Sequence, residues 1–102
     1  MNIGSLYTVK AYHWLLFPSL ETAMIRIGQV SSFTFSNSLA ANREAAWVSE
    51  HLNCNVTCVS SGSYIIFLEE DGRYKKVLTS DGRIGWTWIN KNDDNCFQEL
   101  KS

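Results

Sequence analysis

Two Asp-Gly dipeptides, Asp71-Gly72 and Asp81-Gly82, constrain the fold of this chain more than any other feature. Each lies between runs rich in β-branched and aromatic residues. A type I′ hairpin turn needs a positive φ angle at both central positions, and Asp-Gly is well suited to supply it. A third turn is expected at Ser61-Gly62-Ser63. Together the turns predict a four-stranded antiparallel meander over residues 55–89.

The strands of this meander differ in how much of their surface is apolar. Residues 64–68 are apolar on both faces, so we expect this strand at the centre of the sheet. A polar loop is predicted at residues 91–95. A short last strand should follow over residues 96–100, with Phe97 as its anchor.

The first part of the chain also has the alternation of a strand. Residues 4–17 predict one long strand or two strands separated by a bend. Residues 14–17 are continuously apolar, which indicates burial on both faces, and Pro18 marks the exit because it cannot donate to a strand ladder.

Two further elements are expected between Pro18 and the main helix. Ser19 can cap a short helix over residues 20–27, with Gly28 just past its end. A strand beginning at Met24 is the alternative. Residues 32–36 predict a short strand.

The clearest helical pattern runs over residues 38–52, from Ser38 to Leu52. Asn37 or Ser38 can cap its start, and Asn53 can take the left-handed conformation at its end. Its apolar positions share one helical stripe, which consists of Ala41, Ala45, Val48 and Leu52.

Composition indicates one globular domain without a charge bias. The 102 residues are 45% apolar and 19% charged, and nine Lys+Arg against ten Asp+Glu leave a net charge of −1. Such a balance supplies no general attraction to nucleic acid or to an anionic membrane. No apolar run approaches the roughly 20 residues that span a bilayer. Three cysteines without a secretory signal indicate free thiols in a reducing compartment, which makes a cytoplasmic protein the expectation.

The C-terminal half resembles a known small fold. Residues 77–86, VLTSDGRIGW, with the polar loop and short strand that follow, resemble the end of an SH3-like barrel, and residues 4–9, GSLYTV, resemble its opening strand. The resemblance covers about residues 4–17 and 55–100. It implies a mainly β protein, an SH3-like antiparallel small barrel with one inserted α-helix at about Ser38–Leu52, within an insertion at residues 18–53. The acidic run and paired tryptophans of peptide-binding SH3 domains are absent from their expected places, which argues against binding of proline-rich peptides. In general style the chain also resembles small phage or marine bacterial proteins.

The thiols and imidazoles do not form a recognisable reactive or metal site. His51, Cys54 and Cys58 lie close in sequence, and Cys96 could approach them in a closed barrel, but their spacing is not that of a zinc knuckle. No flanking signature supports a Cys/His nucleophile pair. We therefore expect buried free thiols, with no metal, cofactor or catalytic residue.

Aromatic side chains are the best candidates for binding. Trp86 and Trp88 share one face of a predicted strand, where they would fill the core or, if exposed, form a platform for a peptide, a base or a partner subunit. The core is the commoner place for large aromatics at this spacing. The set considered is Tyr7, Tyr12, Trp14, Tyr74, Trp86 and Trp88.

Opposite charges flank the first Asp-Gly turn. Acidic residues 69–71 precede it, and Arg73, Lys75 and Lys76 follow it. Cross-strand ion pairing is the simpler interpretation. The alternative is a patch facing phosphate groups, formed by these cations together with Arg83.

The function expected from these features is that of a non-enzymatic protein-interaction or assembly module. A partly open barrel leaves unpaired strand edges, so self-association into a homo-oligomer through an edge or an exposed aromatic face is a hypothesis. The alternative is a nucleic-acid-binding small barrel that uses the basic hairpin and the aromatic residues. No membrane partner is expected.

Overall fold

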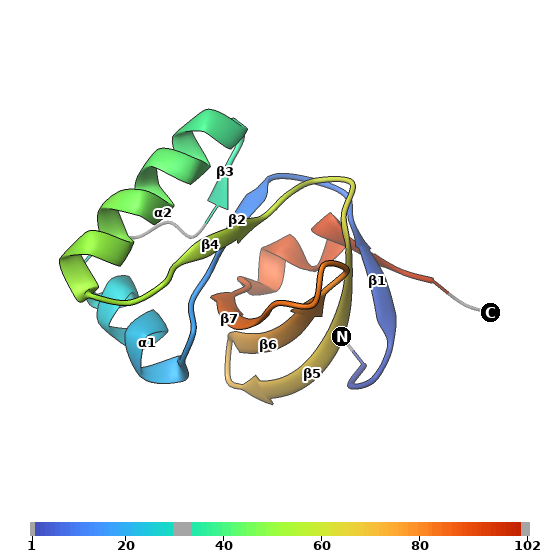
Figure 1. The fold of residues 1–102 in the computed structure, drawn as a ribbon. Coiled ribbons are helices and arrows are strands. Elements are labelled where there is room, and N and C mark those ends of the chain that lie inside the picture. The colour runs from blue at the N-terminus through green and yellow to red at the C-terminus, as the bar shows by residue number, and fades with distance from the viewer. Residues whose placement is uncertain (1, 30–33, 101–102) are drawn as a thin grey trace.

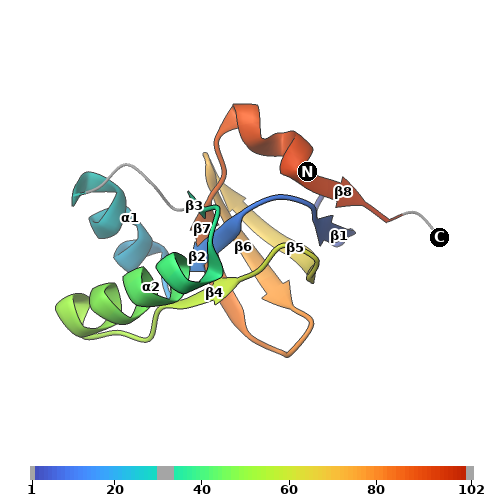
Figure 2. The same cartoon turned by 90° about the horizontal axis from the view of Figure 1, so that it is seen from above.

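The computed structural model describes residues 2–29 and 34–100 of the chain. It is mainly β, with helices packed at one end (Figures 1 and 2). The described elements, in chain order, are β1 (Leu6–Val9), β2 (His13–Leu16), α1 (Leu20–Gln29), β3 (Thr34–Phe35), α2 (Ser38–Leu52), β4 (Thr57–Val59), β5 (Tyr64–Asp71), β6 (Tyr74–Thr79), β7 (Ile84–Trp88), the 3₁₀-helix η1 (Lys91–Cys96) and β8 (Phe97–Glu99).

The larger sheet is antiparallel and has the strand order β7-β6-β5-β1-β8. Both Asp-Gly hairpins are confirmed, and β5 is the central strand, as predicted. The turn type differs from the prediction, since the positive φ angles fall on Gly72 (60°) and Gly82 (86°) and not on the aspartates. In the second turn the Gly82 N–H donates to the Thr79 carbonyl at 3.1 Å, which matches a three-residue loop ending in a left-handed glycine.

The prediction of a four-stranded meander is wrong in its first strand. β4 lies in the other sheet, where Cys58 is opposite Leu15 of β2, so the meander has only β5, β6 and β7. A turn does form at Ser61-Gly62-Ser63, but it carries the chain from one sheet to the other. Its Gly62 N–H donates to the carbonyl of Val9 at 2.7 Å. The strand beside β5 is β1. A turn sequence determines where the chain reverses, but it does not determine which strand pairs with the strand that follows the turn.

The predicted strand over residues 4–17 is two strands with a bend, one of the two forms expected. The bend contains Tyr12, whose φ angle of 68° is left-handed. β1 stays in the larger sheet, and β2 forms a three-stranded sheet of order β3-β2-β4.

The apolar run that ends β2 is buried on both faces, as predicted. Trp14 and Leu16 belong to a first core against the inner face of the larger sheet. Leu15 and Phe17 belong to a second core between β2, the two helices and β7. β2 therefore divides the interior, and its Leu16 lies so close to β7 that a Cβ on Gly85 would be 2.5 Å from the Leu16 Cγ.

The two sheets are joined at a single isolated bridge in the described structure. Phe17 and Trp86 exchange two backbone hydrogen bonds, of 2.8 and 2.7 Å. The strands thus form two connected antiparallel sheets and not a closed barrel.

Helix α2 has the predicted bounds. Its cap is the Asn37 side chain, which accepts from the Leu39 and Ala40 N–H groups at 2.8 and 3.3 Å, and Asn53 ends it with a φ angle of 52°. Its buried residues are Ala41, Ala45 and Val48.

Helix α1 is confirmed, and the alternative strand from Met24 is wrong. The Ser19 hydroxyl accepts from the Thr22 N–H at 3.2 Å, as an N-cap does. The helix extends to Gln29, so Gly28 lies inside it and not beyond its end. Of the predicted strand at residues 32–36, Thr34 and Phe35 form β3, and residues 32 and 33 lie outside the described residues.

The last elements return to the first strand. The predicted polar loop is the 3₁₀-helix η1, and the predicted final strand is β8, which pairs with β1. In the parts of the chain that the structure describes, no helix has the length and apolarity needed to cross a bilayer.

Candidate functional site

An apolar row crosses the outer face of the larger sheet. The strand register places Leu6 opposite Ile66, Ile66 opposite Leu78, and Leu78 opposite Ile84. The N–H of Leu100 donates to the Leu6 carbonyl at 2.9 Å, which extends the row to the end of β8. Residues directly opposite each other in a ladder point to the same face. The outer row thus consists of Leu100, Leu6, Ile66, Leu78 and Ile84, and we use that name below.

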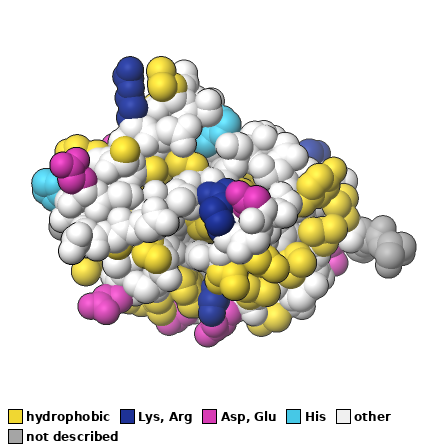
Figure 3. Space-filling model, viewed as in Figure 1, with side chains coloured by type: hydrophobic (Ala, Val, Ile, Leu, Met, Phe, Trp, Pro, Cys, Tyr) yellow, Lys and Arg dark blue, Asp and Glu magenta, His cyan; other side chains and the backbone are white. Residues whose placement is uncertain are grey.

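The outer row is accessible to solvent. Ile84 is 55% exposed, Leu100 40% and Leu6 39%, and Tyr64 beside them is 48% exposed. Figure 3 shows a band of hydrophobic side chains on this side of the molecule, from the lower centre to the right-hand side. The first core lies on the opposite face of the sheet, so it does not cover the outer row.

A small hollow lies within the outer row. Its volume is about 70 Å³, and its lining contains no charged residue. Leu6, Ile66 and Leu78 form its apolar wall, with Tyr64 and Ser80 at its border. It is large enough for a few side-chain atoms of a partner.

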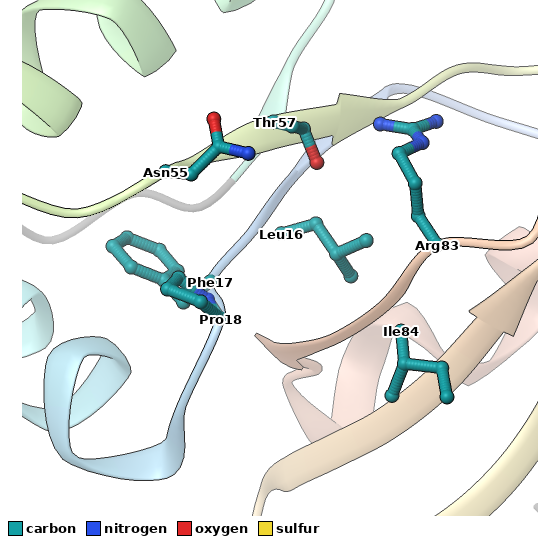
Figure 4. Close-up of a pocket in the computed structure, with 7 residues that line it drawn as sticks. All are labelled: Leu16, Phe17, Pro18, Asn55, Thr57, Arg83 and Ile84. Carbon is teal, nitrogen blue, oxygen red and sulfur yellow. The ribbon is translucent and has the colours of Figure 1, made fainter.

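A larger groove begins at the Ile84 end of the outer row. It measures about 170 Å³ and lies between β7 and the start of β4 (Figure 4). Leu16, Phe17 and Pro18 line it together with Ile84, and Asn55, Thr57 and Arg83 add polar groups. Ile84 is therefore shared by the outer row and the groove.

Arg83 is held across the edge of this groove by two sets of contacts. Its Nε donates to both carboxylate oxygens of Asp81 at 3.0 and 2.9 Å, and its Nη1 donates to the Cys58 carbonyl of β4 at 3.0 Å. The Thr79 hydroxyl donates to Asp81. This hydroxyl, and then the guanidinium, hold the pKa of Asp81 below its usual range. The Arg83 charge is thus largely compensated.

The predicted cationic patch is mostly paired in the same way. Lys75 Nζ lies 3.4 Å from a Glu70 oxygen, and Lys76 Nζ lies 3.6 Å from a Glu69 oxygen. Lys75 also donates to the Gly72 carbonyl at 2.7 Å. Arg73 is exposed beside them. The cross-strand pairing expected from the sequence is therefore present.

The structure separates the predicted aromatic set. Trp86 is buried and Trp88 and Tyr74 are half-buried around the second core, because the helical end of the molecule covers that end of β7. Tyr7 is buried, and its hydroxyl accepts from the Asn2 N–H at 2.6 Å. Tyr12 is exposed and makes an edge contact with Trp14, which is buried.

The thiols differ in burial: Cys96 is buried, as predicted, whereas Cys54 and Cys58 are only half-buried. Burial raises the pKa of the Cys54, Cys58 and Cys96 thiols, and for Cys58 the nearby Arg83 opposes part of this effect. Within the described residues all three are free, and no group of three or more His, Cys, Asp or Glu side chains could hold a metal ion.

The outer row was missed at the sequence level, although its residues alternate visibly along each strand. On β5, Ile66 lies between the buried Ile65 and Phe67, and on β6, Leu78 lies next to the buried Val77, so both faces of these strands carry apolar residues. Only the strand order shows which set is covered. Trp47 of α2 was not singled out either, yet it is 51% exposed and stacks on His51 with ring centroids 4.3 Å apart.

No family model, no curated protein and no solved structure matches this chain.

Proposed function

We propose that this protein is a non-enzymatic protein-interaction or assembly module, active in a reducing compartment such as the cytoplasm, that binds its partner on the outer row. The observation that carries the proposal is the register itself. Four strands contribute one exposed or half-buried aliphatic residue each, side by side, and Leu100, just past β8, adds a fifth. Contiguous exposed apolar side chains with a polar border are typical of interaction surfaces.

We further propose that the scaffold is an SH3-like small barrel. A three-stranded meander, a 3₁₀-helix and a short last strand that pairs with the first strand are supporting features. In this interpretation the insertion between β1 and β5 is longer than the predicted residues 18–53, because β2 and β4 lie with β3 in the second sheet. The Phe17–Trp86 bridge brings that insertion against the open side of the sheet.

Binding to a protein fits the electrostatics of this chain better than catalysis by a thiol or binding to nucleic acid. Raised thiol pKa values leave little thiolate for nucleophilic chemistry. Nucleic-acid binding has less support, because Lys75, Lys76 and Arg83 each face a carboxylate. Interface centres are poor in charged residues, as is the hollow within the outer row.

Site-specific photo-crosslinking tests the proposed function. A benzophenone amino acid at Leu78 should give adducts of defined mass in cells that produce the protein. The matched control is the same substitution at Leu39, an exposed leucine of α2. Adducts at Leu78 that Ile84→Lys reduces would support the proposal. No adduct at Leu78 above the Leu39 control would refute it.

A further inference from the structure

The outer edge of β8 is an open strand edge. Lys10 N–H donates to Cys96 O at 2.7 Å, and Leu100 N–H donates to Leu6 O at 2.9 Å. Even-numbered residues of this segment therefore face β1, and Phe97 and Glu99 present their backbone groups to the opposite side. The Phe97 N–H donates to Asp94 O. This leaves the Phe97 carbonyl and both backbone groups of Glu99 without a partner in the part of the chain that the structure describes.

Two other strand edges are blocked in part by groups of the same molecule. On β4, Val56 N–H and C=O both bond the Ser49 hydroxyl, at 2.8 and 3.1 Å, and the Cys58 carbonyl accepts from Arg83. On β7, both backbone groups of Trp86 pair with Phe17. Proteins commonly block sheet edges in such ways to prevent pairing with another chain. The edge of β8 has no such cover among the described residues.

We propose that β8 pairs with β8 of a second copy of this chain, antiparallel and about a two-fold axis at Gln98. This inference goes beyond the proposed function, because it places a second copy at the edge of β8 and not on the outer row. A two-fold axis requires each surface to complement itself. With Gln98 opposite its symmetry mate, Phe97 is opposite Glu99, and each Glu99 N–H meets a Phe97 carbonyl.

This register also suits the charges along β8. The Glu99 carboxylate accepts from Asn2 Nδ2 at 2.9 Å and from the Tyr7 hydroxyl at 3.4 Å, so it is already directed toward its own molecule. In the proposed register the two Glu99 residues are not opposite each other, which avoids a like-charge pair. The two Gln98 side chains, exposed on the outer face, meet at the axis and can exchange hydrogen bonds.

The proposed register places both outer rows on the same face of the pair. Each row ends on the β8 side at Leu100, which is 40% exposed. The two five-stranded sheets become one continuous sheet, and the centre of this face is polar, because the Gln98 pair lies between the two Leu100 residues.

A charge-exchange experiment at Gln98 tests this pairing in the full chain. Gln98→Lys and Gln98→Glu each place like charges at about 4.5–5.5 Å between Cβ atoms across the axis. Sedimentation velocity over a concentration series at low salt should show each homodimer weakened by roughly two- to fivefold. A mixture of the two variants should form a heterodimer at least as tight as the wild-type dimer, because the charges are then opposite.

Thr8 provides the matched control. It lies opposite Gln98 on the next strand, on the same face, but about two strand spacings further from its mate across the axis. Thr8→Lys and Thr8→Glu should therefore change dimerisation less than the Gln98 variants, without preference for the heterodimer.

The outcomes separate this inference from the proposed function. A strict monomer at all concentrations, or a dimer indifferent to both Gln98 variants, overturns the β8 pairing. If adducts at Leu78 persist in that case, the proposed function stands with another partner. If the heterodimer forms but Leu78 gives no adduct, the β8 pairing stands and the role of the outer row in binding fails.

Discussion

At the scale of single residues, two buried threonines on neighbouring strands differ in whether their hydroxyl groups are hydrogen-bonded. Thr79 is 5% exposed, and its hydroxyl bonds Asp81 and accepts the Arg83 N–H at 3.0 Å. Thr87 is 1% exposed, and its hydroxyl has no hydrogen-bond partner among the described residues. A buried hydroxyl without a partner costs free energy that a hydrogen-bonded one does not. The same residue type therefore has different consequences for stability at these two sites.

We predict that Thr87→Val leaves the free energy of unfolding unchanged or raises it, because the methyl group removes an unsatisfied polar atom. Thr79→Val should lower it by about 1–3 kcal/mol, because the Arg83 N–H and Asp81 lose a partner. Urea unfolding of both variants measures the difference. Equal losses in the two variants would contradict the assigned environments.

At the scale of elements, α2 is the helix whose two ends are defined by asparagine. Asn37 caps its first turn through the side chain, and Asn53 ends it in the left-handed conformation. Between them, the buried side of α2 consists of small residues and one valine. Small side chains allow the helix to lie close to β2 and β4 but bury little apolar area. The helix therefore depends more on its caps than a helix with a leucine-rich face would.

We predict that Asn37→Ala lowers the free energy of unfolding by about 0.5–2 kcal/mol, because two first-turn N–H groups lose their acceptor. Asn42→Ala, an exposed position within the same helix, is the control and should be neutral or slightly stabilising through its higher helix propensity. Thermal and urea unfolding followed by circular dichroism measures both. A loss in Asn42→Ala as large as that in Asn37→Ala would show that the cap is unimportant.

At the scale of the whole molecule, β2 makes the two cores one cooperative unit. Its residues alternate between the first core and the second, and Phe17 at its end pairs with Trp86 of the other sheet. The helical end therefore cannot separate from the sheet without exposing one face of β2. We infer that the chain unfolds in a single step.

Phe17→Ala tests this cooperativity. Phe17 is fully buried, so its truncation should cost about 3–5 kcal/mol. Circular dichroism, which follows the helices, and tryptophan fluorescence should still give one coincident transition at a lower denaturant concentration. Leu6→Ala, at an exposed position, is the control and should cost much less. Two separate transitions in Phe17→Ala would refute the shared-core interpretation.

Local signals in the sequence were sufficient for the elements that local physics controls. The two Asp-Gly turns, the bounds and caps of α2, the burial of residues 14–17 and the last strand around Phe97 were all predictable. Each depends on backbone conformations or hydrogen bonds within a few residues. The Lys75 and Lys76 pairs with Glu70 and Glu69 belong to the same class, because one hairpin turn brings them together.

Tertiary structure alone decided which strands are neighbours and which faces remain open. Whether β1 or β4 lies beside β5 depends on competition between strands that are distant in sequence, and the hydrophobic pattern of each permits either arrangement. The same alternation on β7 carries both Trp86, which the second core covers, and Ile84, which it does not. Exposure depends on what packs against a strand, and no pattern within that strand contains this information. The candidate site could therefore be located only after the strand order was known.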